Sequence, residues 1–354
     1  MGEREDKTVL LGLSPDELAE LAVEAGARSF AGNQIAAWIY GRGATGFGEM
    51  TDLATAVRAK LGETCEVAPG RIVSCEESGE ETTKLAIALN DGTVIESVLM
   101  TERGREGDRF TACLSTQAGC AMGCRFCASG LSGLKRNLTA GEILGQLTQL
   151  GTTLAKGTRI TNVVFMGMGE PLHNLAALRT AITALNAPWG FGLGARRITV
   201  STVGLPKAMR ELANFGVQVN LAVSLHAVDD DSRSSLIPTN AGISEILNAA
   251  EHYFDKTGRE VTIEYTLVGG ENDSREHAAK LATLLHDYPK VNVNLIAMNP
   301  VGGTGLNAPT TAAVEEFRET LSNSGVNTHV RRRRGRTVQA ACGQLRLRVQ
   351  EEVL

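Results

Sequence analysis

The sequence predicts an α/β protein built on a parallel sheet. From residue 110 onward, short apolar runs typical of strands alternate regularly with amphipathic helical patterns. The strand runs are continuously apolar, as expected for strands that helices cover on both faces. Six such units fit either an open doubly wound sheet or a partial barrel. Both architectures place ligands and chemistry at the carboxyl ends of the strands.

The individual elements of this region follow from composition and capping signals. The expected strands cover 111–115, 161–166, 197–202, 219–224, 261–267 and 292–297, with a seventh at 326–331. The expected helices cover 139–152, 175–186, 205–214, 243–256, 273–287 and 311–323. Thr139 and Glu142 form a capping box at the start of the first of these helices.

The preceding residues predict two further units. Residues 9–63 are helical in pattern, and Ser14, Pro15 and Glu17 give a strong helix start. The second and third helices of this unit are expected at 31–40 and 51–61. Residues 70–100 change to strand periodicity, with a hairpin turn at Asn90-Asp91-Gly92.

Composition excludes several classes of protein. The chain has 354 residues, 43% of them hydrophobic, so it is not mainly disordered. The sequence contains no long apolar run and no signal-peptide pattern, which predicts a cytoplasmic protein with no membrane partner. The net charge of −5 argues against general nucleic-acid coating, although the arginines at 331–334 and 336 form a local basic run.

The seven cysteines are unevenly spaced. Cys120, Cys124 and Cys127 lie within eight residues, directly after the first expected strand. Three thiolates on one short loop favour a soft metal, either zinc or an iron–sulfur cluster. A structural zinc site closes with four ligands, whereas three ligands on a four-iron cluster leave one iron open to a substrate.

Small polar groups and glycines recur at the ends of the other strands. Gly169 and Glu170 follow the second strand, where glycine lets the backbone approach a ligand. This loop lacks the third glycine of a dinucleotide site, and Pro171 follows it at once. The later strands end near Ser201, Ser224-Leu225-His226 and Asn299. Singly, such residues are often structural, but together they favour a ligand site.

The cysteine triplet resembles the signature of the radical S-adenosylmethionine (SAM) superfamily. That resemblance implies a partial (β/α)6 barrel in which Cys120, Cys124 and Cys127 hold a [4Fe–4S] cluster. It further implies that the open iron binds SAM and that reductive cleavage of SAM gives a radical. The SAM-binding residues implied are Gly169, Glu170, Ser201, Ser224, Leu225, His226 and Asn299.

Over nearly its whole length the chain resembles the RlmN and Cfr family of radical SAM RNA methyltransferases. The resemblance rests on segments 34–40, 47–51, 113–120, 165–172, 224–226 and 341–345. It implies methylation of carbon 2 or carbon 8 of an adenine in 23S rRNA. Pro171 after Gly169-Glu170 fits the RlmN branch, which acts on carbon 2 and also on the adenosine 3′ of the tRNA anticodon. Met298 departs from the Trp that many relatives carry.

The same resemblance assigns roles to two further cysteines and one carboxylate. Cys342 is implied to receive a methyl group from SAM and to carry it to the base. Cys113 is implied to release the product by attacking the Cys342 sulfur, which forms a transient disulfide. Glu96 is implied to accept the carbon-2 proton, with Cys113 as a competing acceptor.

The expected domains are a helical accessory unit at 1–65, a β linker at 66–106, the barrel at 107–336 and a C-terminal segment at 337–354 that carries Cys342. The expected partners are 23S rRNA, tRNA and an electron donor such as flavodoxin or ferredoxin with its reductase, and the chain is expected to be a monomer. The alternatives are a carbon-8 methyltransferase, an iron–sulfur or zinc protein that binds RNA without catalysis, and a radical SAM enzyme with another substrate.

Overall fold

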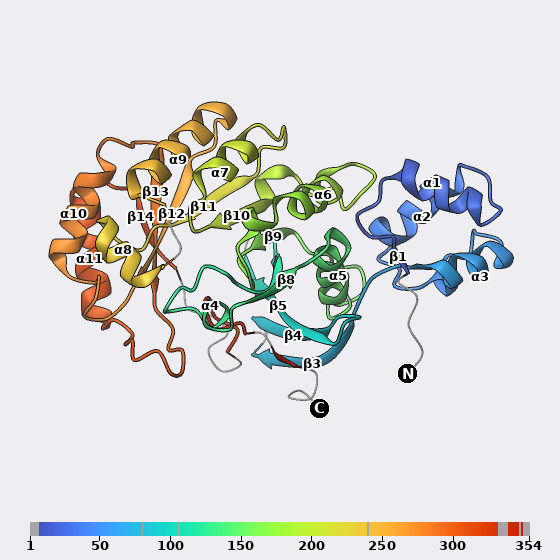
Figure 1. Ribbon diagram of the computed structural model, residues 1–354, viewed down its shortest axis with the longest axis horizontal. Coiled ribbons are helices and arrows are strands. Elements are labelled where there is room, and N and C mark those ends of the chain that lie inside the picture. The colour runs from blue at the N-terminus through green and yellow to red at the C-terminus, as the bar shows by residue number, and fades with distance from the viewer. Residues whose placement is uncertain are drawn as a thin grey trace.

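In the computed structural model, one large mixed sheet runs through the centre of the molecule (Figure 1). The structure describes residues 7–79, 81–104, 107–238, 241–331, 339–346 and 348–349. The sheet order is β14-β13-β12-β11-β10-β9-β6-β5-β4-β3, and β15 also pairs with β5. The bounds along this path are Thr328–Val330, Val291–Ala297, Val261–Leu267, Asn220–Ser224, Ile198–Thr202, Asn162–Phe165, Arg109–Cys113, Thr93–Glu102, Thr82–Ala88 and Arg71–Ser78, with β15 at Arg348–Val349.

The half of the sheet from β6 to β14 is parallel, and its strands lie in the order in which they occur along the chain. A doubly wound sheet requires a reversal of strand order, whereas a barrel does not. The partial barrel is therefore confirmed. Its main helices are α5 (Ala140–Gly151), α6 (Leu175–Asn186), α7 (Pro206–Ala213), α9 (Ile243–Thr257), α10 (Arg275–Leu285) and α11 (Thr311–Asn323).

The other half of the sheet is antiparallel and comes from the expected β linker. Strands β3, β4 and β5 form a meander, and β5 pairs with β6 at the edge of the barrel. The turn between β4 and β5 contains Asp91, whose carboxylate accepts from the backbone N–H of Thr93 at 2.9 Å. The hairpin expected at residues 90–92 is thus present, and the pairing of β5 with β6 makes the linker strands continuous with the barrel sheet.

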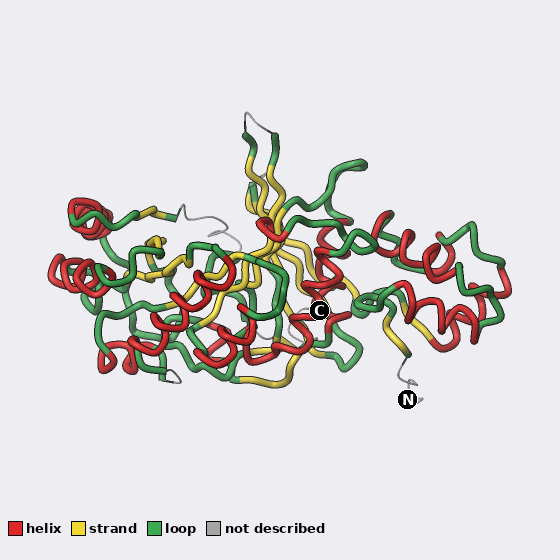
Figure 2. The backbone as a smooth tube through the Cα atoms, turned by 90° about the horizontal axis from the view of Figure 1, so that it is seen from above, coloured by secondary structure: helices red, strands yellow, loops and turns green. Residues whose placement is uncertain are grey.

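The N-terminal unit stands at one end of the molecule (Figures 1 and 2). It contains α1 (Pro15–Glu24), α2 (Ala31–Ala36), α3 (Thr55–Thr64) and a parallel pair β1 (Thr8–Val9) and β2 (Cys65–Glu66). The expected capping box at Ser14 is present. The second helix ends in a π-helical turn over Ala37–Gly41. The third helix starts at Thr55, later than expected, because residues 51–53 form a turn that follows the 3-10 turn Phe47–Glu49.

Aromatic contacts join this unit to the barrel. The Tyr40 ring meets the edges of Trp189 and Phe191 at 5.4 and 5.3 Å between centroids. The Tyr40 hydroxyl donates to the Leu13 carbonyl and accepts from the Gly12 N–H. Edge-to-face pairs of this kind add to the burial of apolar surface.

A short hairpin that the sequence did not predict frames the cysteine loop. Its strands are β7 (Gln117–Gly119) and β8 (Leu134–Asn137), and the short helix α4 (Ala128–Leu131) lies between them. A second unexpected helix, α8 (Asp230–Leu236), follows β11 and is capped by Asp229. Both helices are shorter than the windows in which helical periodicity is detectable.

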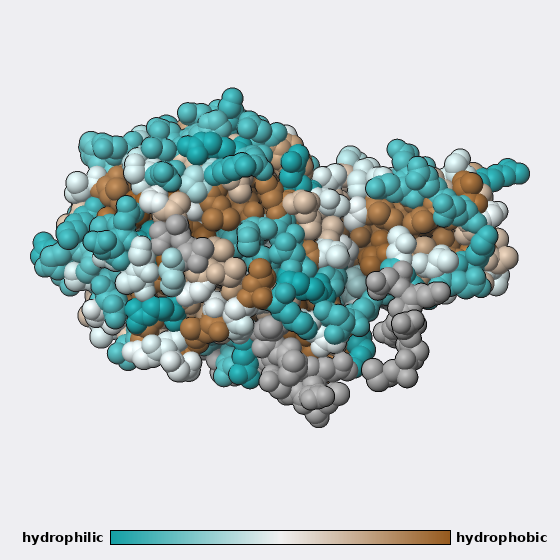
Figure 3. All heavy atoms as spheres, viewed as in Figure 1, coloured by the Kyte–Doolittle hydropathy of each residue, from teal (hydrophilic) through white to brown (hydrophobic). Residues whose placement is uncertain are grey.

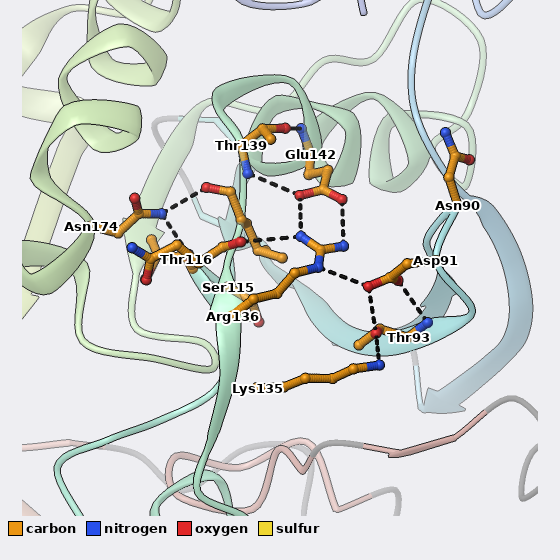
Figure 4. Close-up of polar contacts among 12 residues, drawn as sticks. Asn90, Asp91, Thr93, Ser115, Thr116, Lys135, Arg136, Thr139, Glu142 and Asn174 are labelled. Atoms are coloured by element: carbon orange, nitrogen blue, oxygen red, sulfur yellow. Dashed lines mark hydrogen bonds and ion pairs between the residues drawn. The ribbon is translucent and has the colours of Figure 1, made fainter. Parts of the chain in front are cut away.

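An ion-pair network anchors the hairpin to the barrel (Figure 4). The Arg136 guanidinium donates to both carboxylate oxygens of Glu142 at 2.8 Å and to Asp91 at 2.8 Å. Glu142 simultaneously closes the capping box of Thr139 at the start of α5. Bidentate arginine–carboxylate pairs are strong and directional, so they fix β8 against both the β4–β5 turn and α5.

On the face shown in Figure 3, hydrophilic residues break the apolar surface into separate patches, one of which lies on the N-terminal unit. Within the part of the chain that the structure describes, no helix combines the length and the apolar character needed to span a bilayer.

Candidate active site

A cavity of about 800 Å³ occupies the interior of the barrel. At one end lie the cysteine loop and the carboxyl ends of the strands. At the other end lie Arg109, Asn162, Arg196 and Asn220, near the amino ends of the strands or just before them. The cavity therefore extends along the barrel rather than forming a shallow depression at its mouth.

The three cysteines of the expected cluster site line this cavity. Cys120 and Cys124 are buried and Cys127 is partly exposed. Burial raises the pKa of the Cys120 thiol to about 12, and the neighbouring Cys127 and Glu170 act in the same direction. Burial likewise raises the pKa of Cys124. Three thiols crowded in a low-dielectric pocket favour binding of a cation, which relieves their mutual repulsion on deprotonation.

Among the described residues, no three His, Cys, Asp or Glu side chains converge closely enough to hold a single metal ion. In a cluster each thiolate binds a different iron, so the ligands stand further apart than around one zinc ion. The donor set of three soft thiols and the adjoining open space thus fit an iron–sulfur cluster.

Gly169 and Glu170 occupy the loop after β9. Gly169 has a φ of +100°, and a Cβ there would lie 2.5 Å from the Gln117 side chain, so the loop requires glycine. The buried Glu170 carboxylate accepts from the N–H groups of Leu172 at 3.0 Å and Val203 at 2.8 Å. Burial raises its pKa to about 7, although these hydrogen bonds oppose the shift.

Four of the five other predicted SAM-binding residues line the cavity. Ser201, Ser224, His226 and Asn299 line the cavity together with Gly169 and Glu170. Leu225 does not, because its side chain is fully buried in the core. The buried Oδ1 atom of Asn299 has no hydrogen-bond partner among the described residues, which fits an absent donor such as a ligand amine.

His226 has a defined protonation state. It adopts a φ of +60°, and its Nδ1 accepts from the backbone N–H of Thr266 at 2.9 Å. Burial lowers its pKa to about 3, with a further contribution from Arg233. The ring is therefore neutral with its proton on Nε2, and Phe126 packs edge-to-face against it at 4.9 Å.

Arg233 holds the strand ends around this part of the cavity. The sequence analysis did not single it out, and its side chain is fully buried. Its guanidinium donates to the carbonyls of Val203, Ser224 and Leu225. It thereby joins the ends of β10 and β11, which carry Ser201 and Ser224.

Cys113 and Cys342 come from distant parts of the chain and line the same cavity. Cys113 is buried at the end of β6, while Cys342 is exposed to the cavity. Burial raises the pKa of Cys113 to about 12, and Cys342 contributes to this shift. Burial also raises the pKa of Cys342, whereas Arg331 opposes the increase. All seven cysteines are free thiols.

Residues 339–346, here called the Cys342 segment, form the turn that carries Cys342. The Ala128 N–H donates to the Gly343 carbonyl at 2.8 Å and the Ser129 hydroxyl to the Leu345 carbonyl at 2.6 Å. Asn299 Nδ2 donates to the Cys342 carbonyl at 3.3 Å. Because α4 follows the cluster loop directly, these bonds fix Cys342 beside the three clustered cysteines.

Arg331 is the described part of the basic run. Its side chain lines the cavity and donates to the Met166 sulfur at 3.5 Å. The remaining arginines of the run, at 332–334 and 336, lie outside the described residues. Arg331 thus faces into the cavity.

Glu96 does not line the cavity. It is fully buried in β5, its carboxylate pairs with the buried Lys84 ammonium at 3.4 Å, and it accepts from the Arg346 N–H at 3.0 Å. The carboxylate therefore attaches the end of the Cys342 segment to the sheet. Its predicted role as proton acceptor remains a prediction.

Sequence reasoning missed Glu264 on β12. Its carboxylate lines the cavity and is 4% exposed, and Asn294 Nδ2 donates to both of its oxygens at 3.0 and 3.1 Å. Burial raises its pKa, while Arg331 and Asn294 oppose the shift. A charged residue inside the otherwise apolar strand Val261–Leu267 was the signal that could have revealed it.

Two protein families match this chain, one over the N-terminal unit and one over most of the barrel. Residues 8–67 match the ribosomal RNA large subunit methyltransferase N-terminal domain. Residues 114–282 match the radical SAM superfamily, and this range includes the cysteine loop and most of the barrel.

Full-length relatives extend these matches. A probable dual-specificity RNA methyltransferase RlmN from Rhodopirellula baltica is 45% identical over 96% of this chain and 91% of its own length. A dual-specificity RNA methyltransferase RlmN from Sorangium cellulosum is 42% identical over 94% and 93%. The crystal structure of a radical SAM methyltransferase from Sphaerobacter thermophilus superposes with a TM-score of 0.92 at 40% identity, covering 96% of this chain and 99% of that one. Identity at this level over nearly the whole length shows that the chain belongs to the RlmN family of dual-specificity RNA methyltransferases, within the radical SAM superfamily.

Proposed function

We propose that the protein methylates carbon 2 of an adenine in 23S rRNA, and of the adenosine 3′ of the anticodon in tRNA, with Cys342 as the methyl carrier. The observation that carries this proposal is the meeting of Cys113 and Cys342 in one cavity with Cys120, Cys124 and Cys127. Membership of the RlmN family supports RNA as the substrate.

The residues that hold the cofactors are Cys120, Cys124 and Cys127 for the cluster, and the cavity-lining strand ends for SAM. When bound, these groups supply the methyl group and the one-electron chemistry that a non-nucleophilic ring carbon requires. The orphaned Asn299 Oδ1 and the buried Glu170 carboxylate provide acceptors for a ligand amine.

Cys342 performs the transfer in two stages. Its sulfur first takes a methyl group by displacement, and Arg331 favours the thiolate needed for this attack because its charge lowers the pKa of the thiol. One hydrogen atom of that methyl group would be lost to the one-electron chemistry that the bound cofactors supply, and the remaining CH2 carbon bonds to carbon 2 of the base. The RNA is then linked covalently to the Cys342 sulfur until the carbon-2 proton is removed and the carbon–sulfur bond breaks.

Cys113 releases the product. Its thiolate attacks the Cys342 sulfur, an S–S bond forms, the carbon–sulfur bond breaks and the methylated RNA leaves. External reduction of that disulfide restores both thiols. Burial keeps Cys113 protonated at neutral pH, so its proton must be removed before it attacks.

The carbon-2 proton has two candidate acceptors in this proposal, Glu96 and Cys113. Glu96 lies beneath the Cys342 segment and is paired with Lys84, whereas Cys113 lines the cavity directly. Because Cys113 lines the cavity, the geometry supports it as the acceptor once its thiol, which burial keeps protonated, has lost its own proton.

The N-terminal unit, residues 1–65, supplies RNA contacts outside the cavity in this proposal, and a reduced flavodoxin or ferredoxin supplies electrons. The RNA-binding role of the N-terminal unit is supported by its match to the ribosomal RNA large subunit methyltransferase N-terminal domain.

A trapping experiment tests the central step. The Cys113→Ala variant, produced in cells and purified anaerobically, should retain RNA joined to the Cys342 peptide through a methylene bridge, detectable by mass spectrometry. The Cys75→Ala variant is the matched control, because Cys75 is exposed on β3 and outside the cavity. An unmodified Cys342 in a Cys113→Ala protein with an intact cluster would contradict the carrier mechanism. Nucleoside analysis of wild-type product separates carbon-2 from carbon-8 methylation.

A further inference from the structure

The interior of the barrel contains a polar group for which the proposed mechanism has no use. Glu264 projects into the cavity from β12, in the middle of a strand whose other buried residues are mainly apolar. A buried carboxylate is costly unless it is paired and hydrogen-bonded. Asn294 and Arg331 meet part of this requirement, and the place of Glu264 in the cavity lining leaves its carboxylate accessible to a ligand.

The carboxylate is held in a fixed orientation. Asn294, on the adjacent strand β13, donates to both oxygens at 3.0 and 3.1 Å, and residues 264 and 294 are register partners. An ionised carboxylate offers about four acceptor positions, so further acceptor capacity remains toward the cavity.

Arg331 supplies the complementary charge. It lines the same cavity and interacts electrostatically with Glu264, Cys342 and Cys113. The guanidinium therefore interacts both with the Glu264 carboxylate and with the two thiols that act on the base. Its hydrogen bond to the Met166 sulfur holds the side chain inside the barrel.

A carboxylate, a guanidinium and two thiols complement, in that order, the groups along one edge of adenine. The exocyclic amine is a donor, ring atom N1 beside it is an acceptor, and carbon 2 follows N1 on the same Watson–Crick edge. Carbon 8 lies on the other ring. Enzymes that take a base out of its stack commonly recognise it through hydrogen bonds to this edge.

We propose that Glu264, held by Asn294, accepts a hydrogen bond from the exocyclic amine of the target adenine, and that Arg331 donates to N1. The inference rests on the proposed function and deepens it. With the amine and N1 bound in this way, carbon 2 lies on the side of Arg331 that faces Cys342 and Cys113, which accounts for modification of carbon 2. A guanine would place its O6 acceptor against the carboxylate and is rejected.

The experiment uses short RNA hairpins that differ only in the target nucleoside, with the cluster-loaded enzyme. The targets are adenosine, purine ribonucleoside, which lacks the amine, and 1-deazaadenosine, which lacks the N1 acceptor. Wild-type kcat/KM should favour adenosine over the purine by about 10- to 100-fold, the effect of losing one hydrogen bond to a charged group.

Glu264→Leu should lower kcat/KM for the adenosine substrate by about 10- to 100-fold. The same variant should change kcat/KM for the purine substrate less than threefold. Glu264→Gln keeps the side-chain shape and should show a smaller loss of preference, which preserves the test if the Leu variant does not fold. Arg331→Met should reduce the preference for adenosine over 1-deazaadenosine, but not the preference for adenosine over the purine.

Two controls separate recognition from folding. Glu260→Gln alters an exposed carboxylate just before β12 and should leave every ratio unchanged. Methylation of Cys342 in the absence of RNA, seen as the added mass on its peptide, should still occur in the Glu264 variants, because that step involves no base.

Equal losses on adenosine and purine in the Glu264 variants would overturn the inference and leave Glu264 a structural residue. A wild-type enzyme that treats the two substrates alike would overturn it as well. Failure of the loaded wild-type enzyme to methylate adenosine at carbon 2 would instead reject the proposed function, and the inference with it.

Discussion

Cys113 and Cys342 face the same cavity but are held in opposite ways. Cys113 ends a central strand, with Val98 of β5 and Val164 of β9 as register partners on its two sides. Cys342 lies on a turn that no strand pairing supports within residues 339–346. One thiol is thus fixed by the sheet and the other by a small number of separate hydrogen bonds.

This difference in how the two thiols are held corresponds to the chemical role proposed for each. Cys342 meets a methyl donor, a base and a second thiol in turn, whereas Cys113 acts once on a sulfur brought to it. We infer that the Cys342 segment adjusts its position during the cycle and that the sheet around Cys113 does not. This inference can be tested at the attachments of the segment to Ser129 and Glu96 and at Gly343 within the segment itself.

The largest expected effect is on the rate at which the Cys113 thiol is alkylated. Because burial raises the pKa of Cys113 to about 12, its thiol stays protonated at pH 7, and it should react with iodoacetamide about a thousandfold more slowly than an ordinary thiol. Its rate should rise about tenfold for each unit of pH below that pKa. Peptide-resolved mass spectrometry of cluster-free protein measures this, with exposed Cys75 as the internal reference. Equal rates for Cys113 and Cys75 at pH 7 would show that Cys113 is not shielded.

The attachment through Glu96 should give the next largest effect. Lys84→Met removes the buried ammonium that pairs with the Glu96 carboxylate at 3.4 Å, which should lower the free energy of unfolding by about 3–5 kcal/mol in urea titrations. The double variant Lys84→Met/Glu96→Leu removes both charges and should recover most of that loss. A single variant as stable as wild type would mean that water reaches the pair.

Gly343→Ala should disturb the turn itself. Gly343 has a φ of +82°, and an added Cβ would lie 3.2 Å from the Phe126 carbonyl oxygen. We expect a cost of about 1–2 kcal/mol and a several-fold decrease in Cys342 methylation, read by peptide mass. Gly270→Ala is matched, because Gly270 has a φ of +79° with no atom within 4 Å of the new Cβ. Identical methylation in both variants would show that the position of the turn is unimportant.

Ser129→Ala should have the smallest effect. It removes the hydrogen bond to the Leu345 carbonyl, worth about 1 kcal/mol, and should speed hydrogen exchange of residues 339–346 about fivefold. Ser132→Ala is the control, since the Ser132 hydroxyl donates only to the Ala128 carbonyl within its own helical turn. Unchanged exchange in the Ser129 variant would place the restraint elsewhere.

Local signals in the sequence were sufficient for the barrel and for the cysteines. Alternating apolar strands and amphipathic helices predicted all seven parallel strands, and the capping boxes of Ser14 and Thr139 are present as expected. The spacing of Cys120, Cys124 and Cys127 is itself a local motif, so it could be recognised without any tertiary information.

Pairs that form only on folding could not be predicted in the same way. Lys84 and Glu96 meet because β4 and β5 are adjacent, and neither residue belongs to a local motif that indicates this pairing. Glu264 depends on Asn294 and Arg331, which are distant in sequence and come together only when the barrel closes. The β7–β8 hairpin was missed because its strands are too short to show a period.

The neutral imidazole of His226 gives the mouth of the barrel a fixed polarity. Its Nδ1 is occupied as an acceptor by Thr266, so the ring can only donate to a ligand, through Nε2. Asn299 Oδ1, after β13 and so two strands away from His226, is an unfilled acceptor within the described structure. A ligand that fits both must carry an acceptor at one position and a donor at the other. The two side chains therefore select one orientation of an unsymmetrical ligand through hydrogen bonding alone, without any contribution from charge.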